Sequence, residues 1–355
     1  MAPAIDALDP WYLEHLVCPA DRTRLEFDGT HLVSAAGRRY PVVDGMPVML
    51  MGDRQQTMDI ARISFERASG NASVIDHRAP DYYLETLGVG EPQRARLVEL
   101  VRDGIDAIDP VVSLLIAGTS GTAYLHLVGN TELAAYPIPS IDVPASKGGY
   151  LLDVGCNWGR WCVAATRAGH KAVGIDPSLG AVMAARRVAR QLGLDIKYVV
   201  GDARWLPFAE RSFDVIHSYS VIQHFSKADA RRALREMGRV LNPEGTAKIQ
   251  MANRIGIRSF QTQWRRGFKP PEKFDVRYWP LSGLKRSFEQ AIGPTRIVTD
   301  CYFGLGWQWA DFGVMQTRHK PVLIASEILK RLSRIIPPMT RVADSVYCIA
   351  SKPGG

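Results

Sequence analysis

The stretch that decides the fold is Leu151-Leu-Asp-Val-Gly-Cys-Asn-Trp-Gly-Arg-Trp161. It joins a short apolar run to a turn with two glycines and then to an amphipathic segment, which is typical of a buried strand that enters a tight turn before a helix. Glycines in such a turn let the backbone approach a ligand closely, and the N–H groups of the helix start then point toward that ligand. We therefore expect a ligand at the carboxyl end of this strand.

Strand-length apolar runs alternate with helical stretches from residue 150 onward. The runs lie at 151–154, 172–175, 196–200, 213–216 and 246–251, and a closing strand is expected at 345–351. This alternation predicts an α/β fold, doubly wound, with a mostly parallel sheet covered by helices on both sides. Helices are also expected at 92–102 and 321–336, and short strands at 24–27, 31–34 and 40–43.

Carboxylates stand at the ends of three of these runs. Asp176 ends the second run, in Val173-Gly-Ile-Asp-Pro177, and Asp202 ends the third, in Val200-Gly-Asp-Ala203. A carboxylate at the second strand end can accept both ribose hydroxyls of a nucleoside. Asp153 suits a cationic ligand better than a pyrophosphate, and Asn157 replaces the second glycine of the dinucleotide-binding pattern. The alternative is that Asp176 and Asp202 only cap helices or turns.

With these three acidic strand ends, residues 150–241 resemble the class I S-adenosylmethionine (SAM)-dependent methyltransferases, especially those that act on small molecules. The resemblance implies a seven-stranded sheet, SAM as cofactor and methyltransferase activity. It implies that Asp153, Gly155 and Gly159 surround the methionine part, that Asp176 holds the ribose, and that Asp202 with Ala203 contacts the adenine. The predicted cofactor-binding residues are Asp153, Gly155, Cys156, Asn157, Gly159, Asp176, Pro177, Asp202, Ala203 and Ser218.

The methyl acceptor should lie just past the fourth strand, where the sequence reads His217-Ser-Tyr-Ser-Val-Ile-Gln-His-Phe225. His224 is the candidate general base for an acceptor hydroxyl, and the alternative is that it only shapes the pocket. Aromatic and basic side chains after the fifth strand suit a sugar ring, an aromatic acceptor or an unstacked base. The predicted substrate-binding residues are Tyr219, Gln223, Trp264, Arg265, Tyr278, Trp279 and Trp307, and the alternative is that the aromatic insertions form a lid packed on itself.

The first 51 residues form a separate small module. Cys18-Pro19, Tyr40-Pro41, Asp44-Gly45 and Pro47 resemble the zinc-ribbon family of small methyltransferase-activating subunits. Ala20-Asp21 stands where a second cysteine belongs and no later cysteine pair follows, so we expect a metal-free module and no metal site elsewhere. Residues 52–149 are predicted to be a helical or irregular connector that covers the pocket. The methyltransferase domain is expected at 150–355, with insertions at about 254–280 and 303–343.

The chain has 355 residues, 46% hydrophobic content and a formal net charge of +8. Segments 254–273 and 318–341 each hold six Lys or Arg against one Glu, which suits phosphates on RNA, on a nucleotide-linked sugar or on a lipid head group, or else is a solvated surface. No run approaches the roughly 20 apolar residues of a membrane span. The beginning of the chain does not resemble a secretory signal and the five cysteines are scattered, so we expect a cytoplasmic protein with reduced thiols.

Three functions are compatible with these features. The leading hypothesis is an O-methyltransferase for a small-molecule or glycan-like acceptor, which is anionic or lipid-linked if the basic segments contact it. Segment 321–336 is apolar with interspersed basic residues, which suits peripheral membrane contact or packing on its own domain. An RNA methyltransferase is the second hypothesis, although an Asn-Pro-Pro-Tyr-type motif is absent from the sequence. The third is a catalytically inactive SAM-binding partner protein.

Overall fold

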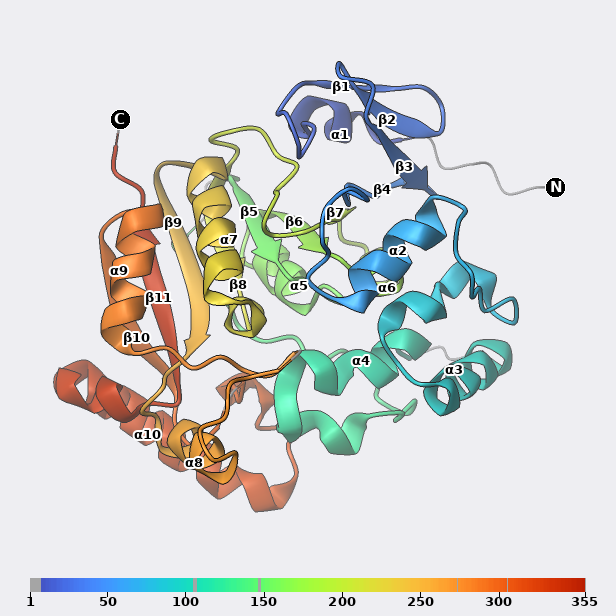
Figure 1. The fold of residues 1–355 in the computed structure, drawn as a ribbon. Helices are drawn as coiled ribbons and strands as arrows, with labels where there is room; N and C mark the ends of the chain where they lie inside the picture. Colours follow the sequence, from blue (N-terminus) through green and yellow to red (C-terminus); the bar gives the residue numbers. More distant parts are fainter. Residues whose placement is uncertain (1–7, 105–106, 146–147, 273, 305, 355) are drawn as a thin grey trace.

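The computed structural model describes residues 8–104, 107–145, 148–272, 274–304 and 306–354. Its main sheet has the strand order β10-β11-β9-β8-β5-β6-β7, and β11 alone runs antiparallel to its neighbours in this described sheet (Figure 1). The predicted doubly wound, mostly parallel seven-stranded α/β sheet is confirmed. Its strands are β5 (Tyr150–Val154), β6 (Lys171–Asp176), β7 (Lys197–Val200), β8 (Phe213–Ser218), β9 (Leu241–Ala252), β10 (Thr295–Cys301) and β11 (Ser345–Ser351).

Helices cover both faces of this sheet. Helices α5 (Arg160–Arg167) and α6 (Leu179–Gln191) pack on one face, and α7 (Lys227–Val240) and α9 (Leu281–Ala291) on the other. Side chains alternate along each strand, so the odd-numbered Leu151 joins the apolar cluster of α5 and α6, whereas Leu152 joins that of α7 and α9. Ser178 and Ser226 cap the starts of α6 and α7 through their hydroxyl oxygens, which fixes where each helix begins.

The N-terminal module is a four-stranded antiparallel sheet attached to the edge of the main sheet. The Met49 N–H donates to the Val200 carbonyl over 2.7 Å, so the module covers the otherwise open edge of β7. Leu16 is buried in the same apolar cluster as Leu152. The Cys18 thiol lies 3.1 Å from the Tyr40 hydroxyl. The module contains α1 (Pro10–His15), β1 (Leu25–Phe27), β2 (His31–Ser34), β3 (Arg39–Val43) and β4 (Met46–Pro47).

The connector is helical and lies over α6. It holds α2 (Asp59–Ala68), α3 (Glu91–Asp103) and α4 (Pro110–Ser120), of which only α3 was expected as a helix. Among the described residues, no three His, Cys, Asp or Glu side chains are grouped so that they could hold a metal ion.

Two further helices, α8 (Ile257–Arg265) and α10 (Lys320–Ile335), follow β9 and β10. Helix α10 leaves Ile328 53% and Ile335 80% exposed, and peripheral membrane contact stays a prediction. No helix in the described ranges is long and apolar enough to cross a bilayer. Strand β10 and helices α8 and α9 were not anticipated from the sequence.

Candidate cofactor and active site

The turn between β5 and α5 has a strained backbone that glycine and asparagine can adopt. Gly155, Asn157 and Gly159 have φ values of 78°, 46° and 81°, in the left-handed region. A Cβ atom on Gly155 would lie 2.2 Å from a Val221 methyl carbon. Asn157 tolerates this region, and its side-chain oxygen accepts the Trp158 N–H over 2.8 Å. The asparagine that replaces the expected second glycine therefore preserves the tight turn.

A cavity of about 430 Å³ opens at this turn, where the parallel strands end. The eight predicted residues that line it are Gly155, Asn157, Asp176, Pro177, Asp202, Ala203, Tyr219 and His224. Thr57, Met58 and Leu87 of the connector also line it, as does Phe274 from the insertion after β9. The sequence carries no motif at these four positions, because they reach the cavity only through long-range packing.

Asp176 ends β6 with its carboxylate in the cavity wall. The carboxylate accepts the N–H groups of Asn157 and Ser178, each over 3.0 Å. Burial raises its pKa to about 6, because the ionised form is poorly solvated there. A carboxylate has about four lone-pair sites, so two remain for hydroxyl donors of a ligand.

Asp202, at the next strand end, is bound by its neighbour Arg204. The Arg204 guanidinium donates to Asp202 over 2.7 Å and also to the carbonyl of Gln55 over 2.6 Å. Asp202 thus ties the connector to the end of β7, while Ala203 beside it faces the cavity.

Other predicted cofactor residues lie beside the cavity rather than in its lining. Asp153 is 1% exposed and points to the α5 face, where its carboxylate oxygen lies 3.1 Å from Nδ1 of His217. Cys156 is buried, and its sulfur lies with that of Cys162 beneath Gly174. The Ser218 hydroxyl donates to the Val154 carbonyl over 2.8 Å. A Cβ atom on Gly159 would meet Tyr198. These residues therefore support the turn between β5 and α5 without lining the cavity.

His224 lies in a short 3-10 helix (Ile222–His224) that follows β8. Its Nδ1 is 2.7 Å from the Phe274 carbonyl oxygen, and its ring stacks on the Phe274 ring at 3.9 Å. A carbonyl only accepts, so Nδ1 carries the proton and Nε2 keeps a lone pair. Burial lowers the pKa of His224 below its usual range, which favours the neutral imidazole.

The predicted substrate residues are spread over several environments. The Tyr219 hydroxyl donates to Asp300 over 3.1 Å, while Gln223 is buried and donates to the Ser220 hydroxyl. Trp264 on α8 is 68% exposed. Within the described lining of the cavity, Tyr219 is the single member of the predicted substrate set. Arg265 is exposed, Tyr278 is half-buried, and Trp279 and Trp307 are buried.

Comparison with known proteins bears on the same region. A family model described as a methyltransferase domain matches residues 151–245. Residues 151–245 are therefore similar to a methyltransferase domain. The strand order of the sheet agrees with the class I type of this domain, which uses SAM as its cofactor. The matched region begins at β5, so the resemblance of the N-terminal module to activator subunits stays a prediction.

Relatives match over part of their length. The ubiquinone biosynthesis O-methyltransferase of Azorhizobium caulinodans is 34% identical over 114 residues, which cover 32% of this chain and 44% of that protein. Norajmaline N-methyltransferase of Rauvolfia serpentina is 35% identical over 105 residues, which cover 29% of this chain and 35% of that protein. The chain thus spans less than half the length of these relatives. The solved structure of Bacillus subtilis YcgJ has a TM-score of 0.40 and 20% identity, covering 60% of this chain and 95% of YcgJ.

Proposed function

We propose that this protein transfers a methyl group from SAM to a hydroxyl of a small-molecule or glycan-like acceptor. The observation that carries the proposal is His224, whose side chain lines the same cavity as Asp176 and whose Nε2 keeps a lone pair. A hydroxyl must lose its proton as its oxygen attacks a methyl group, and a neutral imidazole suits that role. The matching ubiquinone biosynthesis O-methyltransferases also favour an oxygen acceptor over RNA.

The residues of the cavity fit the cofactor. The Asp176 carboxylate retains lone pairs for ribose hydroxyls, and Ala203 offers an apolar contact to the adenine next to Asp202. Gly155 and Asn157 line the same space, and the absence of a side chain at Gly155 avoids a clash with Val221. SAM, when bound, supplies a methyl group made electrophilic by the positive charge on sulfur. The chain's own part is to hold the two reactants in line and to take up a proton.

Proton removal is assigned to Nε2 of His224. The hydrogen bond from Nδ1 to the Phe274 carbonyl fixes the tautomer, and the stacked Phe274 ring restricts rotation of the imidazole. The lowered pKa keeps Nε2 unprotonated near neutral pH. The proton taken from the acceptor hydroxyl then resides on Nε2 until it is released to solvent.

The acceptor is proposed to enter through a neighbouring cavity of about 1,010 Å³. This entry cavity shares His224, Phe225 and Phe274 with the cofactor cavity, so His224 stands between the two. The wall of the entry cavity carries charges of both signs, with positive charges on Arg62 and Arg277 and a negative charge on Asp229. An acceptor with several polar groups fits this lining better than a purely apolar one.

Isotope-labelled SAM, incubated with the protein and a metabolite extract, tests the proposal by mass spectrometry. We expect the label on an oxygen atom of a small molecule. His224→Ala should then lower kcat on that acceptor by about a hundredfold, as is typical for a lost general base, and leave S-adenosylhomocysteine affinity unchanged. His77→Ala, which removes an exposed histidine of the connector, is the matched control and should keep wild-type turnover. Label found on a nitrogen atom or on RNA contradicts the proposal, and so does an unchanged kcat in His224→Ala. If the protein binds the cofactor tightly but transfers no methyl group, an inactive SAM-binding partner protein is favoured instead.

A further inference from the structure

A row of four polar side chains, interrupted by Ile349, crosses the main sheet on its α5 face. Register places Asp153 of β5 beside His217 of β8, His217 beside Lys248 of β9, Lys248 beside Ile349 of β11, and Ile349 beside Arg296 of β10. His217 and Lys248 are only 0% and 6% exposed. Buried sheet faces are normally apolar, since burying charged groups is costly. The row therefore indicates a function other than packing.

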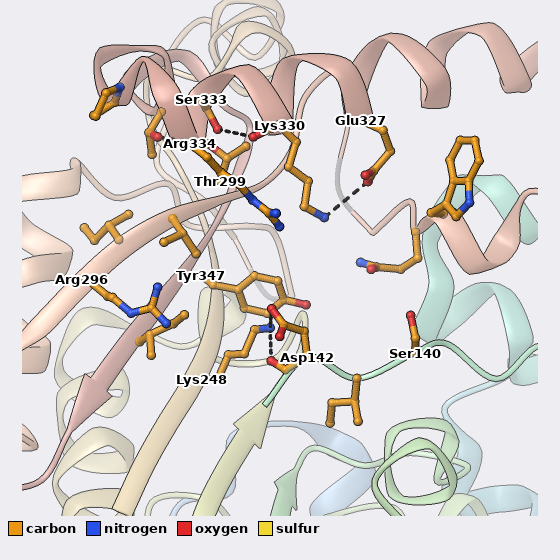
Figure 2. Close-up of a pocket in the computed structure, with 18 of the residues that line it drawn as sticks. Ser140, Asp142, Lys248, Arg296, Thr299, Glu327, Lys330, Ser333, Arg334 and Tyr347 are labelled. Atoms are coloured by element: carbon orange, nitrogen blue, oxygen red, sulfur yellow. Dashed lines mark hydrogen bonds and ion pairs between the residues drawn. The ribbon is translucent and has the colours of Figure 1, made fainter. Parts of the chain in front are cut away.

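A cavity of about 930 Å³ lies between this row and α10. Figure 2 shows Lys330 and Arg334 coming from α10 above the cavity, and Lys248, Arg296 and Tyr347 from the strands below it. The lining has five Lys or Arg side chains, the fifth being Arg341, against the two carboxylates of Asp142 and Glu327. The cavity is thus positively charged, and cations reach it from the sheet and from the helix.

Two buried groups at the wall of this cavity lack full compensation. Nδ1 of His217 is paired with Asp153, but its Nε2 is buried with no hydrogen-bond partner among the described residues. The Lys248 ammonium donates to the Asp142 main-chain carbonyl and lies 4.4 Å from the centroid of the Tyr347 ring. Its ion-pair partner, the Asp142 carboxylate, is 3.4 Å away on a side chain that is 96% exposed, so the buried charge is weakly neutralised. Buried polar groups normally have partners, so the unpaired Nε2 and the weakly neutralised ammonium together indicate a ligand.

We propose that this cavity is a second ligand site, which binds the phosphate group of an organic molecule. Lys248 supplies a buried point charge, and the forked guanidinium groups of Arg296 and Arg334 suit the several oxygens of a phosphate. Trp161 and Tyr347 in the lining offer an apolar contact for a sugar or base attached to it. A volume of this size falls within the range of cavities that hold such ligands.

The proposed phosphate site is separate from the cofactor cavity. Tyr219 lines the cofactor cavity, whereas Trp161 and His217 line the phosphate site. Ring centroids of Trp161 and His217 lie 5.0 Å and 6.4 Å from that of Tyr219, so one aromatic layer divides the two. The inference does not depend on methyl transfer, and both ligands should bind at the same time.

Calorimetry on the full chain tests the site with inorganic pyrophosphate and uridine diphosphate as probes. We expect saturable binding that weakens with salt, because the interaction is between charges. Lys248→Met keeps an unbranched side chain that is one atom shorter, removes the charge and should weaken binding by about tenfold or more. Arg286→Gln, on the exposed surface of α9 at the opposite face, removes the same charge and should bind as wild type. Saturating S-adenosylhomocysteine should leave probe affinity unchanged.

Several outcomes overturn the proposal: no binding to the wild type, equal weakening by Arg286→Gln, or competition with S-adenosylhomocysteine. If Lys248→Met fails to fold, the exposed Arg334→Gln and Arg296→Gln carry the test. Sedimentation with phosphatidylcholine vesicles, with and without phosphatidic acid, distinguishes a lipid phosphate from a soluble one. S-adenosylhomocysteine affinity, measured in the same variants, reports on the cofactor cavity separately, so failure of one site is not mistaken for failure of the other.

Discussion

Replacing Asp176 with asparagine should weaken cofactor binding with little change in the fold. The carboxylate accepts two backbone N–H groups at 3.0 Å and offers its remaining lone pairs to the cavity. An asparagine keeps one oxygen, but its NH₂ group must face an N–H donor or the ligand hydroxyls. A hydrogen bond to a charged group contributes about 1.5–3 kcal/mol. The Kd for S-adenosylhomocysteine should therefore rise by about 10- to 150-fold, since each 1.4 kcal/mol is about tenfold.

Titration calorimetry measures this effect directly, and the product is a suitable ligand because it undergoes no reaction. Asp195→Asn is the matched control: its side chain is 84% exposed beside β7, and its affinity should equal that of the wild type. Wild-type affinity should also fall as the pH drops through about 6, because a protonated carboxyl group at Asp176 loses acceptor lone pairs. Unchanged affinity in Asp176→Asn, with the fold intact by circular dichroism, would refute the assignment of this carboxylate to the ribose.

The remaining predictions concern catalysis and stability. The acid limb of kcat/KM should lie below the ordinary histidine range, since the pKa of His224 is lowered and protonation blocks Nε2; an acid limb above that range contradicts the assignment. Gly155→Ala should lower the free energy of unfolding by about 2–5 kcal/mol, because alanine is strained in the left-handed region and its Cβ clashes with Val221. Urea titrations measure this loss, and adding Val221→Ala should restore part of the lost stability. Leu16→Ala should lower the free energy of unfolding by about 2–5 kcal/mol, and the protein should still unfold in one transition because Leu16 packs in the same cluster as the main sheet. A separate early transition would show that the N-terminal module unfolds alone.

Local sequence patterns accounted for the central part of the fold. The runs that became β5, β6, β8 and β9 were recognisable because a strand buried on both faces must be apolar along its length. Strand β10, Thr295–Cys301, was missed because Arg296, Thr299 and Asp300 interrupt the apolar run. Helix α4 was not predicted, since its sequence is apolar almost throughout and shows no helical periodicity.

The cavity residues also fall into two groups: those that a local pattern identifies and those that only packing brings to their place. Gly155, Asp176 and Asp202 were identifiable because each lies at or just after the end of a strand, and parallel strands bring their carboxyl ends to one edge of the sheet. The position of Asp153 could not be predicted in this way. The alternation of side chains along β5 places Asp153 on the α5 face, where it pairs with His217, 64 residues away in the sequence. Trp279 and Trp307 were grouped by composition alone, and packing buries them elsewhere.

The sequence by itself determined the parallel sheet, the tight turn after β5 and the carboxylates at the strand ends, since all three depend on neighbouring residues. Tertiary structure decided the rest: the connector residues in the cavity wall, the Phe274 carbonyl that fixes the His224 tautomer, and the polar row from Asp153 to Arg296. These features join segments 50 or more residues apart. Strand register and the packing of insertions create them, and no local pattern encodes either.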